Sequence, residues 1–138
     1  MRVVTFISAG VLLLTSAFIM KKTKIPSQSL YENKWVLKKI HTEAGVEKGN
    51  AIAFIQFDEA KQSAGGKGGC NNFGSSISVN ENTIQFKNIF STKMNCETVQ
   101  STENTFIKKL ALVNHFEING KLLGLFHGKE LLLELEAA

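Results

Sequence analysis

The chain of 138 residues is poor in several residue types, and each shortage narrows what it can be. It has one arginine, Arg2, one proline, Pro26, and two cysteines, Cys70 and Cys96. Nucleic-acid readers cluster their basic residues, and arginine supplies bidentate contacts to phosphates and bases. Here the net charge of +4 is spread over single lysines and short pairs. We therefore expect no nucleic-acid partner.

Motifs that carry catalysis or bind metals are also missing. The glycine-rich run at residues 65–69 contains one lysine, but a phosphate-binding loop needs Ser or Thr directly after it, and Gly68 stands there. His41, His115 and His127 are dispersed, without the paired Cys or His spacing that zinc sites use. We expect no cofactor, no metal and no catalytic residue, so the chain is predicted not to be an enzyme.

The N-terminus has the composition of a targeting segment. Residues 3–20 carry no charge, follow Arg2, and include small residues at 15–17 where a signal peptidase could cut. A run of about 18 apolar residues could also stay uncleaved as a short membrane anchor. The predicted organisation is a signal peptide or membrane anchor at 1–20, a linker at 21–30 and one domain at 31–138. This layout predicts export to the periplasm or cell envelope, with membrane attachment through residues 3–20 if the segment is retained.

The two cysteines lie in distinctive settings. Cys70 ends a glycine-rich stretch, and Cys96 directly precedes a helical pattern. An even cysteine count behind an export-like N-terminus predicts one disulfide, with a thiolate nucleophile and a zinc ligand pair as the alternatives. A Cys70–Cys96 bridge would close a loop of about 27 residues and contribute roughly 3.5 kcal/mol to the free energy of unfolding in the chain-entropy model.

Alternating apolar residues predict a series of short strands. Trp35 and Leu37 share one face of the first, and residues 51–57, apolar on nearly both faces, predict a central strand covered on each side. Residues 63–72 are too rich in glycine to form a stable isolated strand. The Asn80-Glu81-Asn82 and Asn119-Gly120 sequences indicate hairpin turns between apolar runs.

Residues 97–113 have the period of an amphipathic helix. One helix face carries Val99, Glu103, Phe106, Leu110 and Val113, at spacings of four, three, four and three residues, and all but Glu103 are apolar. Strands joined by short turns pair antiparallel, so we predict an α+β fold in which a curved sheet or partial barrel packs on this helix.

Glu103 falls on the apolar stripe of this helix. A carboxylate there is costly unless it is hydrogen-bonded. We interpret Glu103 as a structural polar clamp that reaches water or caps nearby backbone amides. A general acid or base would need a second carboxylate or a histidine beside it, and the sequence identifies none.

Several short elements occur in an order that resembles the META/HslJ-type domain family of bacteria. They are Trp35-x-Leu37, Ile55-x-Phe57, Gly69-Cys70-Asn71-Asn72-Phe73, Ile84-x-Phe86, Thr92-x-Met94-x-Cys96, Glu103-x-x-Phe106-x-x-x-Leu110 and a final leucine-rich hairpin. The resemblance covers residues 31–135. It implies an α+β domain whose antiparallel, half-twisted, barrel-like sheet packs on one main helix.

The resemblance also carries expectations about function. It implies an exported cell-envelope protein, in a family linked to heat shock and antibiotic tolerance, without an established catalytic activity. The expected structural-motif residues are Gly69, Asn71, Thr92, Met94 and Glu103, together with the cysteine pair. Bacterial relatives are often lipoproteins, whereas no cysteine lies near the end of the apolar run here.

Three functional hypotheses follow. The first is a non-catalytic, stress-related protein that binds an envelope protein or a small ligand. The second is an inhibitor of a secreted hydrolase, of protease or lysozyme type, which would present the disulfide-fixed residues 65–74 to an active site. The third is an enzyme that uses Glu103 or an unpaired Cys96.

Overall fold

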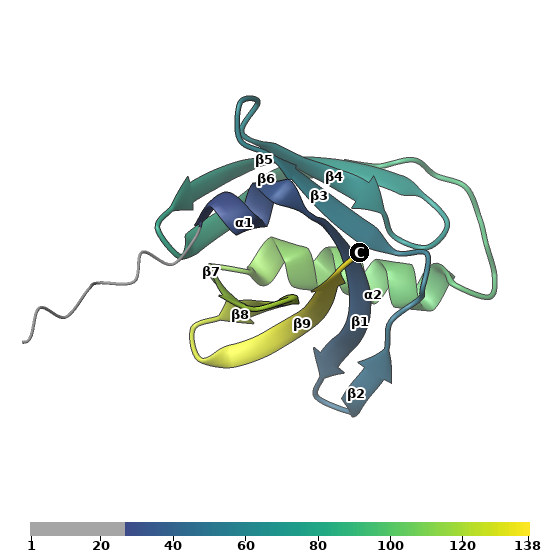
Figure 1. Ribbon diagram of the computed structural model, residues 1–138. Helices are drawn as coiled ribbons and strands as arrows, with labels where there is room; N and C mark the ends of the chain where they lie inside the picture. Colours follow the sequence, from purple (N-terminus) through teal and green to yellow (C-terminus); the bar gives the residue numbers. More distant parts are fainter. Residues whose placement is uncertain (1–26) are drawn as a thin grey trace, which may run out of the picture.

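The computed structural model describes residues 27–138, shown in colour in Figure 1. The signal peptide or anchor predicted at residues 1–20, and most of the predicted linker, lie outside the described residues. In the described range, neither helix is long and apolar enough to cross a membrane.

Two helices and nine strands make up the described range. The helices are α1 (Ser27–Glu32) and α2 (Gln100–Leu112). The strands are β1 (Lys34–Thr42), β2 (Gly45–Lys48), β3 (Phe54–Asp58), β4 (Ser63–Lys67), β5 (Asn72–Asn80), β6 (Thr83–Ser91), β7 (His115–Asn119), β8 (Leu122–His127) and β9 (Glu130–Ala137). Every strand pair is antiparallel, as the short turns predicted.

The strands form one ring-like sheet. Their order is β2-β1-β3-β4-β5-β6-β7-β8-β9, and β9 returns to pair with β1. The ring is weakest between β6 and β7, where one residue pair, Thr83↔His115, joins the strands. Helix α2 lies between the strands β3 to β6 and the strands β7 to β9 (Figure 1). The predicted α+β, antiparallel fold is confirmed, but the sheet is ring-like rather than a barrel and carries two short helices.

The core fills the inside of this ring. Its largest fully buried side chains include Trp35 of β1, Phe106 of α2 and Phe116 of β7. The indole N–H of Trp35 donates to the carbonyl oxygen of Leu30, 2.9 Å away. Leu30 is itself fully buried. Residues 27–30, expected to belong to the linker, therefore form part of α1, because the burial of Leu30 and its hydrogen bond from Trp35 anchor them to the domain.

The strand predicted at residues 51–57 begins later and is covered on one face only. Asn50 makes a turn, in which its side-chain oxygen accepts from the amide of Ile52 and its carbonyl oxygen accepts from the amide of Ala53. This turn delays β3 to Phe54 and leaves Ile52 54% exposed. Within β3, Ile55 faces the core and Gln56 faces solvent.

The glycine-rich stretch contains a strand that glycine content alone argued against. β4 pairs with β3 on one edge and with β5 on the other. Backbone partners on both sides compensate for the weak strand propensity of glycine. A Cβ atom at Gly66 would overlap the carbonyl oxygen of Phe54, so this close pairing requires glycine.

Helix α2 matches its predicted stripe closely. It begins at Gln100 rather than at residue 97, and buries Glu103, Phe106 and Leu110. The ring of Phe106 meets that of Phe73 of β5 edge to face, with centroids 5.6 Å apart. This contact holds the first half of α2 against the sheet and brings Glu103 next to the start of β5.

Candidate functional site

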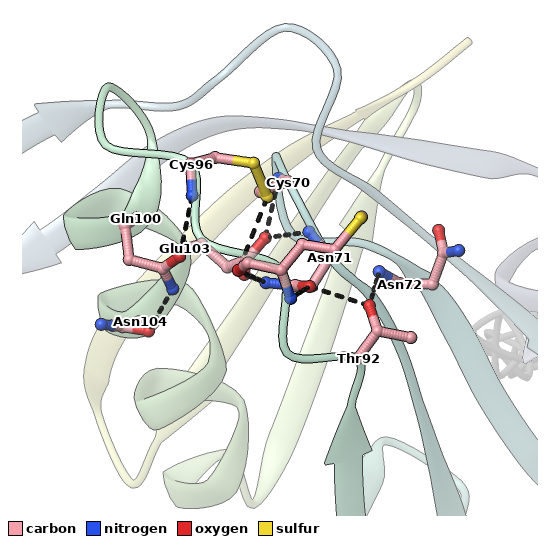
Figure 2. The surroundings of a disulfide bond; sticks show 9 residues. Cys70, Asn71, Asn72, Thr92, Cys96, Gln100, Glu103 and Asn104 are labelled. Carbon is pink, nitrogen blue, oxygen red and sulfur yellow. Dashed lines mark hydrogen bonds between the residues drawn. A yellow bond between two sulfur atoms is a disulfide. The ribbon is translucent and has the colours of Figure 1, made fainter.

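The residues expected as structural motifs converge at the N-terminal end of α2 (Figure 2). Gly69, Cys70 and Asn71 form the turn from β4 to β5. Thr92, Met94 and Cys96 lie in the segment that leads from β6 to α2. Glu103 comes from the first turn of α2. The β4–β5 turn is thus joined to α2 and to the segment that precedes α2.

The carboxylate of Glu103 is the centre of this junction. Its Oε2 accepts from the backbone amides of Cys70, at 2.8 Å, and Asn71, at 2.7 Å. Its Oε1 accepts from the side-chain Nδ2 of Asn71, at 2.6 Å. Glu103 is 3% exposed. These contacts agree with its interpretation as a clamp on backbone amides.

The hydrogen bonds keep this buried carboxylate ionised. Burial acts most strongly on the pKa of Glu103 and raises it, but hydrogen bonds from Asn71, Cys70 and Gln100 together leave the pKa below its usual value of 4.5. Donors that hold the charged form favour ionisation. An ionised carboxylate with both oxygens engaged is a hydrogen-bond acceptor and has no proton to give as a general acid.

Asn71 connects the carboxylate to the segment after β6. Its Oδ1 accepts from the hydroxyl of Thr92, at 2.8 Å, and from the amide of Met94, at 2.7 Å. Its Nδ2 also donates to the carbonyl oxygen of Met94, at 3.0 Å. We call Cys70, Asn71, Thr92, Met94 and Glu103 the Glu103 clamp.

A disulfide reinforces the clamp. Cys70 and Cys96 are bonded, with Cα atoms 5.9 Å apart and a sequence separation of 26 residues. The described residues contain no free cysteine. The predicted bridge is therefore present, and the hypothesis of an unpaired Cys96 is wrong for this structure, because Cys96 is brought against Cys70 by the clamp.

Two glycines are required where the chain turns into the clamp. The amide of Gly68 donates to the carbonyl oxygen of Asn71, at 2.9 Å. A Cβ atom at Gly68 would lie 2.6 Å from Cγ of Glu103. Gly69 has φ of +134°, a conformation that side chains disfavour. The glycine run thus allows the turn to approach the carboxylate closely.

The structure shows where residues 65–74 of the inhibitory-loop hypothesis lie. Residues 65–67 belong to β4, which is paired on both edges. Residues 68–71 are buried, and Asn72 is the one exposed residue of the stretch. Most of the stretch therefore presents little surface to the active site of another protein. The exposed part of the junction is instead the segment at residues 92–95.

An open groove of about 410 Å³ lies beside the clamp. Residues 91–95 form one side of it and α2 forms the other. The lining residues are Asn71, Ser91, Thr92, Lys93, Met94, Asn95, Gln100, Glu103, Asn104, Ile107 and Lys108. The sequence analysis missed this groove. The four-residue spacing of Gln100, Asn104 and Lys108 was visible, but nothing in the sequence placed residues 91–95 opposite them.

The three histidines do not form a site together. His41 Nε2 lies 2.7 Å from Glu134 Oε2, on strands β1 and β9. The ring of His115 stacks on that of Phe126, and His127 Nδ1 donates to the carbonyl oxygen of Leu112. Each therefore has its own local contacts.

Comparison with protein families identifies the family of this chain. The META domain matches residues 28–138, which is most of the chain, and the protein belongs to the META domain family. This confirms the resemblance drawn from the motif order. A search of curated proteins finds no match.

Solved structures share the fold. An NMR structure of a protein from Burkholderia xenovorans is 17% identical, with a TM-score of 0.68, covering 80% of this chain and 85% of that one. A crystal structure of a DUF4847 family protein from Bacteroides vulgatus is 15% identical, with a TM-score of 0.55, covering 79% of this chain and 94% of that one. At these identities the likeness concerns the fold alone.

Proposed function

We propose that this META domain protein is an exported, non-catalytic component of the cell envelope that binds a protein or small ligand in the groove beside the Glu103 clamp. The proposal rests on one observation, which is that both sides of the groove are held in place by the fold. One side is a segment held by the disulfide and by Asn71, and the other is α2, held by Glu103. Rigid walls lower the entropic cost of binding.

The state of Glu103 supports a non-catalytic role. Its two oxygens accept three hydrogen bonds at 2.6 to 2.8 Å, and its pKa is lowered. A general acid or base needs a pKa near the working pH and access to substrate. Glu103 has neither, and its contacts instead hold three segments of the fold together.

Two observations support export. The apolar residues 3–20 have the composition of a signal peptide or anchor. The Cys70–Cys96 disulfide suits an oxidising compartment such as the periplasm. A stress-related role belongs to the proposal through the family resemblance.

Site-specific crosslinking in intact cells tests the proposal. A photoreactive amino acid is placed at Asn104, which lines the groove, or at Lys121, an exposed turn residue outside its lining. We expect a defined adduct from position 104 that is absent from position 121. Equal adducts from both positions, or none from position 104, would contradict a binding role for the groove. Fractionation of the same cells tests export.

One observation favours hydrolase inhibition as a second candidate function, with Met94 rather than residues 65–74 as the inhibitory contact. The side chain of Met94 is exposed while its amide and carbonyl are both held by Asn71. An exposed side chain on a fixed backbone is a suitable contact for the pocket of an enzyme. Titration of secreted proteases and lysozymes tests this. Inhibition that is lost in Met94→Asp supports the candidate, and the absence of inhibition by the wild type eliminates it.

A further inference from the structure

Polar side chains line both sides of the groove. On α2, Gln100, Asn104 and Lys108 follow one another at four-residue steps, a rise of about 6 Å per step. Across the groove, Lys93 and Asn95 are two residues apart in the segment that links β6 to α2. An extended peptide repeats its side-chain direction at an interval of about 6.8 Å. The interval along α2 is close to this, so the groove suits an extended peptide.

The charged groups that line the groove favour an acidic ligand. Lys93 and Lys108 are exposed, and neither forms an ion pair with a carboxylate within the described residues. The one carboxylate in the lining belongs to Glu103, which is buried and already engaged by the clamp. The accessible charge of the groove is thus positive.

The polar groups that remain available are mainly donors. Gln100 Nε2 donates to Asn104 Oδ1, at 3.0 Å, which engages one of the two lone pairs of this oxygen and leaves the amide N–H groups of Asn104 available. The lysine side chains offer donors only. Carboxylates and peptide carbonyls are the matching acceptors. Among the described residues no aromatic side chain lines the groove, so this part of the chain offers no stacking surface for a sugar ring.

From these observations we infer that the groove binds an extended, acidic peptide segment, with carboxylates near Lys93 and Lys108 and peptide groups near Asn95 and Asn104. The inference rests on the proposed function and names its ligand class. It predicts binding that weakens as salt rises, because exposed charges are screened within about 8 Å at physiological ionic strength.

Fluorescence anisotropy tests the inference directly. The probe is a fluorescein-labelled Gly-Glu-Ser-Glu-Ser-Glu peptide, compared with the same peptide carrying Gln in place of Glu. We expect Kd for the acidic peptide to rise at least about tenfold in the double variant Lys93→Gln, Lys108→Gln. The matched control, Lys121→Gln with Lys129→Gln, removes the same charge from exposed turns and is expected to change Kd less than about twofold.

A substitution that keeps the net charge distinguishes peptide binding in the groove from attraction to a diffuse basic surface. Asn104→Leu keeps the net charge and is expected to raise Kd at least about threefold through loss of its amide donors. Unchanged binding in this variant, or equal loss in both double variants, would overturn the inference. Tighter binding of a galacturonic acid trimer than of the peptide would also overturn it, in favour of an anionic glycan.

Failure of this inference can be told apart from failure of the proposed function. If neither acidic peptide nor glycan binds while crosslinking from position 104 still captures a defined partner, the peptide assignment is wrong and the groove remains a binding site. If crosslinking also yields nothing specific, both proposals fail.

Discussion

The two ends of α2 are attached to the sheet in different ways. At its N-terminal end, the Glu103 clamp and the disulfide tie α2 to the start of β5 and to the segment after β6. At its C-terminal end lies the seam, which we define as the one-pair junction of β6 and β7 together with Asn114. There the amide of Ile84 donates to the carbonyl oxygen of Asn114, at 3.2 Å, and the amide of Gly128 donates to Asn114 Oδ1, at 2.9 Å.

The clamp and the seam differ in the charge and in the burial of their hydrogen-bonding groups. The clamp consists of short hydrogen bonds to a buried, ionised carboxylate, which are stronger than bonds between neutral groups. The side-chain bond of the seam is exposed and neutral. Exposed bonds contribute little because water replaces them readily. We therefore expect the ring to be rigid beside the groove and to open locally at the seam.

Loss of the central carboxylate should have the largest effect. Glu103→Leu leaves two backbone amides and one N–H of the Asn71 side chain as buried donors without an acceptor. We expect the free energy of unfolding to fall by about 3–5 kcal/mol. Urea denaturation measures it. Glu117→Leu, at an exposed glutamate of β7, is the control, and a similar small loss in both variants would show that the clamp is unimportant.

Loss of the disulfide should rank second. The double variant Cys70→Ser, Cys96→Ser should lose about 3.5 kcal/mol, the entropy that the bridge removes from the unfolded chain. Urea denaturation with and without dithiothreitol checks this. Reductant should destabilise the wild type and leave the double variant unchanged. Equal stability of the oxidised and reduced wild type would contradict the prediction.

A methyl group added at Gly68, beside the Glu103 carboxylate, should lower the free energy of unfolding by an intermediate amount. In Gly68→Ala the new Cβ meets Cγ of Glu103, and we expect a loss of about 1–3 kcal/mol from overpacking. Thermal unfolding compares it with Gly120→Asn, at an open turn with φ of +60° that asparagine tolerates. Gly120→Asn should change stability by less than about 0.5 kcal/mol. Equal losses would mean that the turn is not tightly packed.

Acid should weaken the clamp selectively. The pKa of Glu103 in the folded protein lies below its usual value of 4.5, so its contribution is complete above that value and is lost as pH falls through the lowered pKa. We expect the unfolding free energy of the wild type to decline more steeply below pH 4.5 than that of Glu103→Gln. Denaturation curves at a series of pH values measure both slopes. Parallel slopes would refute the assignment.

The seam should show the smallest change in stability. Asn114→Ala removes the acceptor of the Gly128 amide, and we expect a loss of about 1 kcal/mol. Amide hydrogen exchange should show faster exchange at Gly128 and no change at Cys70 and Asn71. A global increase that includes the clamp amides would mean that the two ends of α2 are not independent.

Much of the fold followed from local patterns. The stripe of Phe106 and Leu110 predicted α2, and the Asn119-Gly120 pair predicted the β7–β8 hairpin. Three elements were missed: β4, whose glycine content argued against a strand, β2 and α1. All four residues of β2 are exposed, so it has no apolar alternation to detect. In α1, Leu30 is buried and its carbonyl oxygen accepts from the indole of Trp35, and one such contact leaves no period in the sequence.

The candidate site was only half accessible to sequence reasoning. Glu103 and Cys70 could be identified because a glutamate on an apolar stripe and a cysteine after a glycine run both break local patterns. Asn71, Thr92 and Met94 were expected through the family resemblance. Their hydrogen-bond partners could not be identified, because hydrogen bonds between Glu103 and Asn71 join residues 32 positions apart in the chain. The groove was missed for the same reason, since its two sides come from different segments.

By itself, the sequence determined the family, the antiparallel α+β class and the helix, and it predicted the pairing of its two cysteines that the structure shows. These depend on composition, periodicity and motif order, which are local or ordered along the chain. Tertiary structure alone decided that β9 returns to β1, that the glycine stretch is a strand paired on both edges, and that Asn71 links Glu103 to Met94. Such contacts depend on which distant backbone groups meet, and hydrogen-bond partners are selected by the folded chain rather than by neighbours in the sequence.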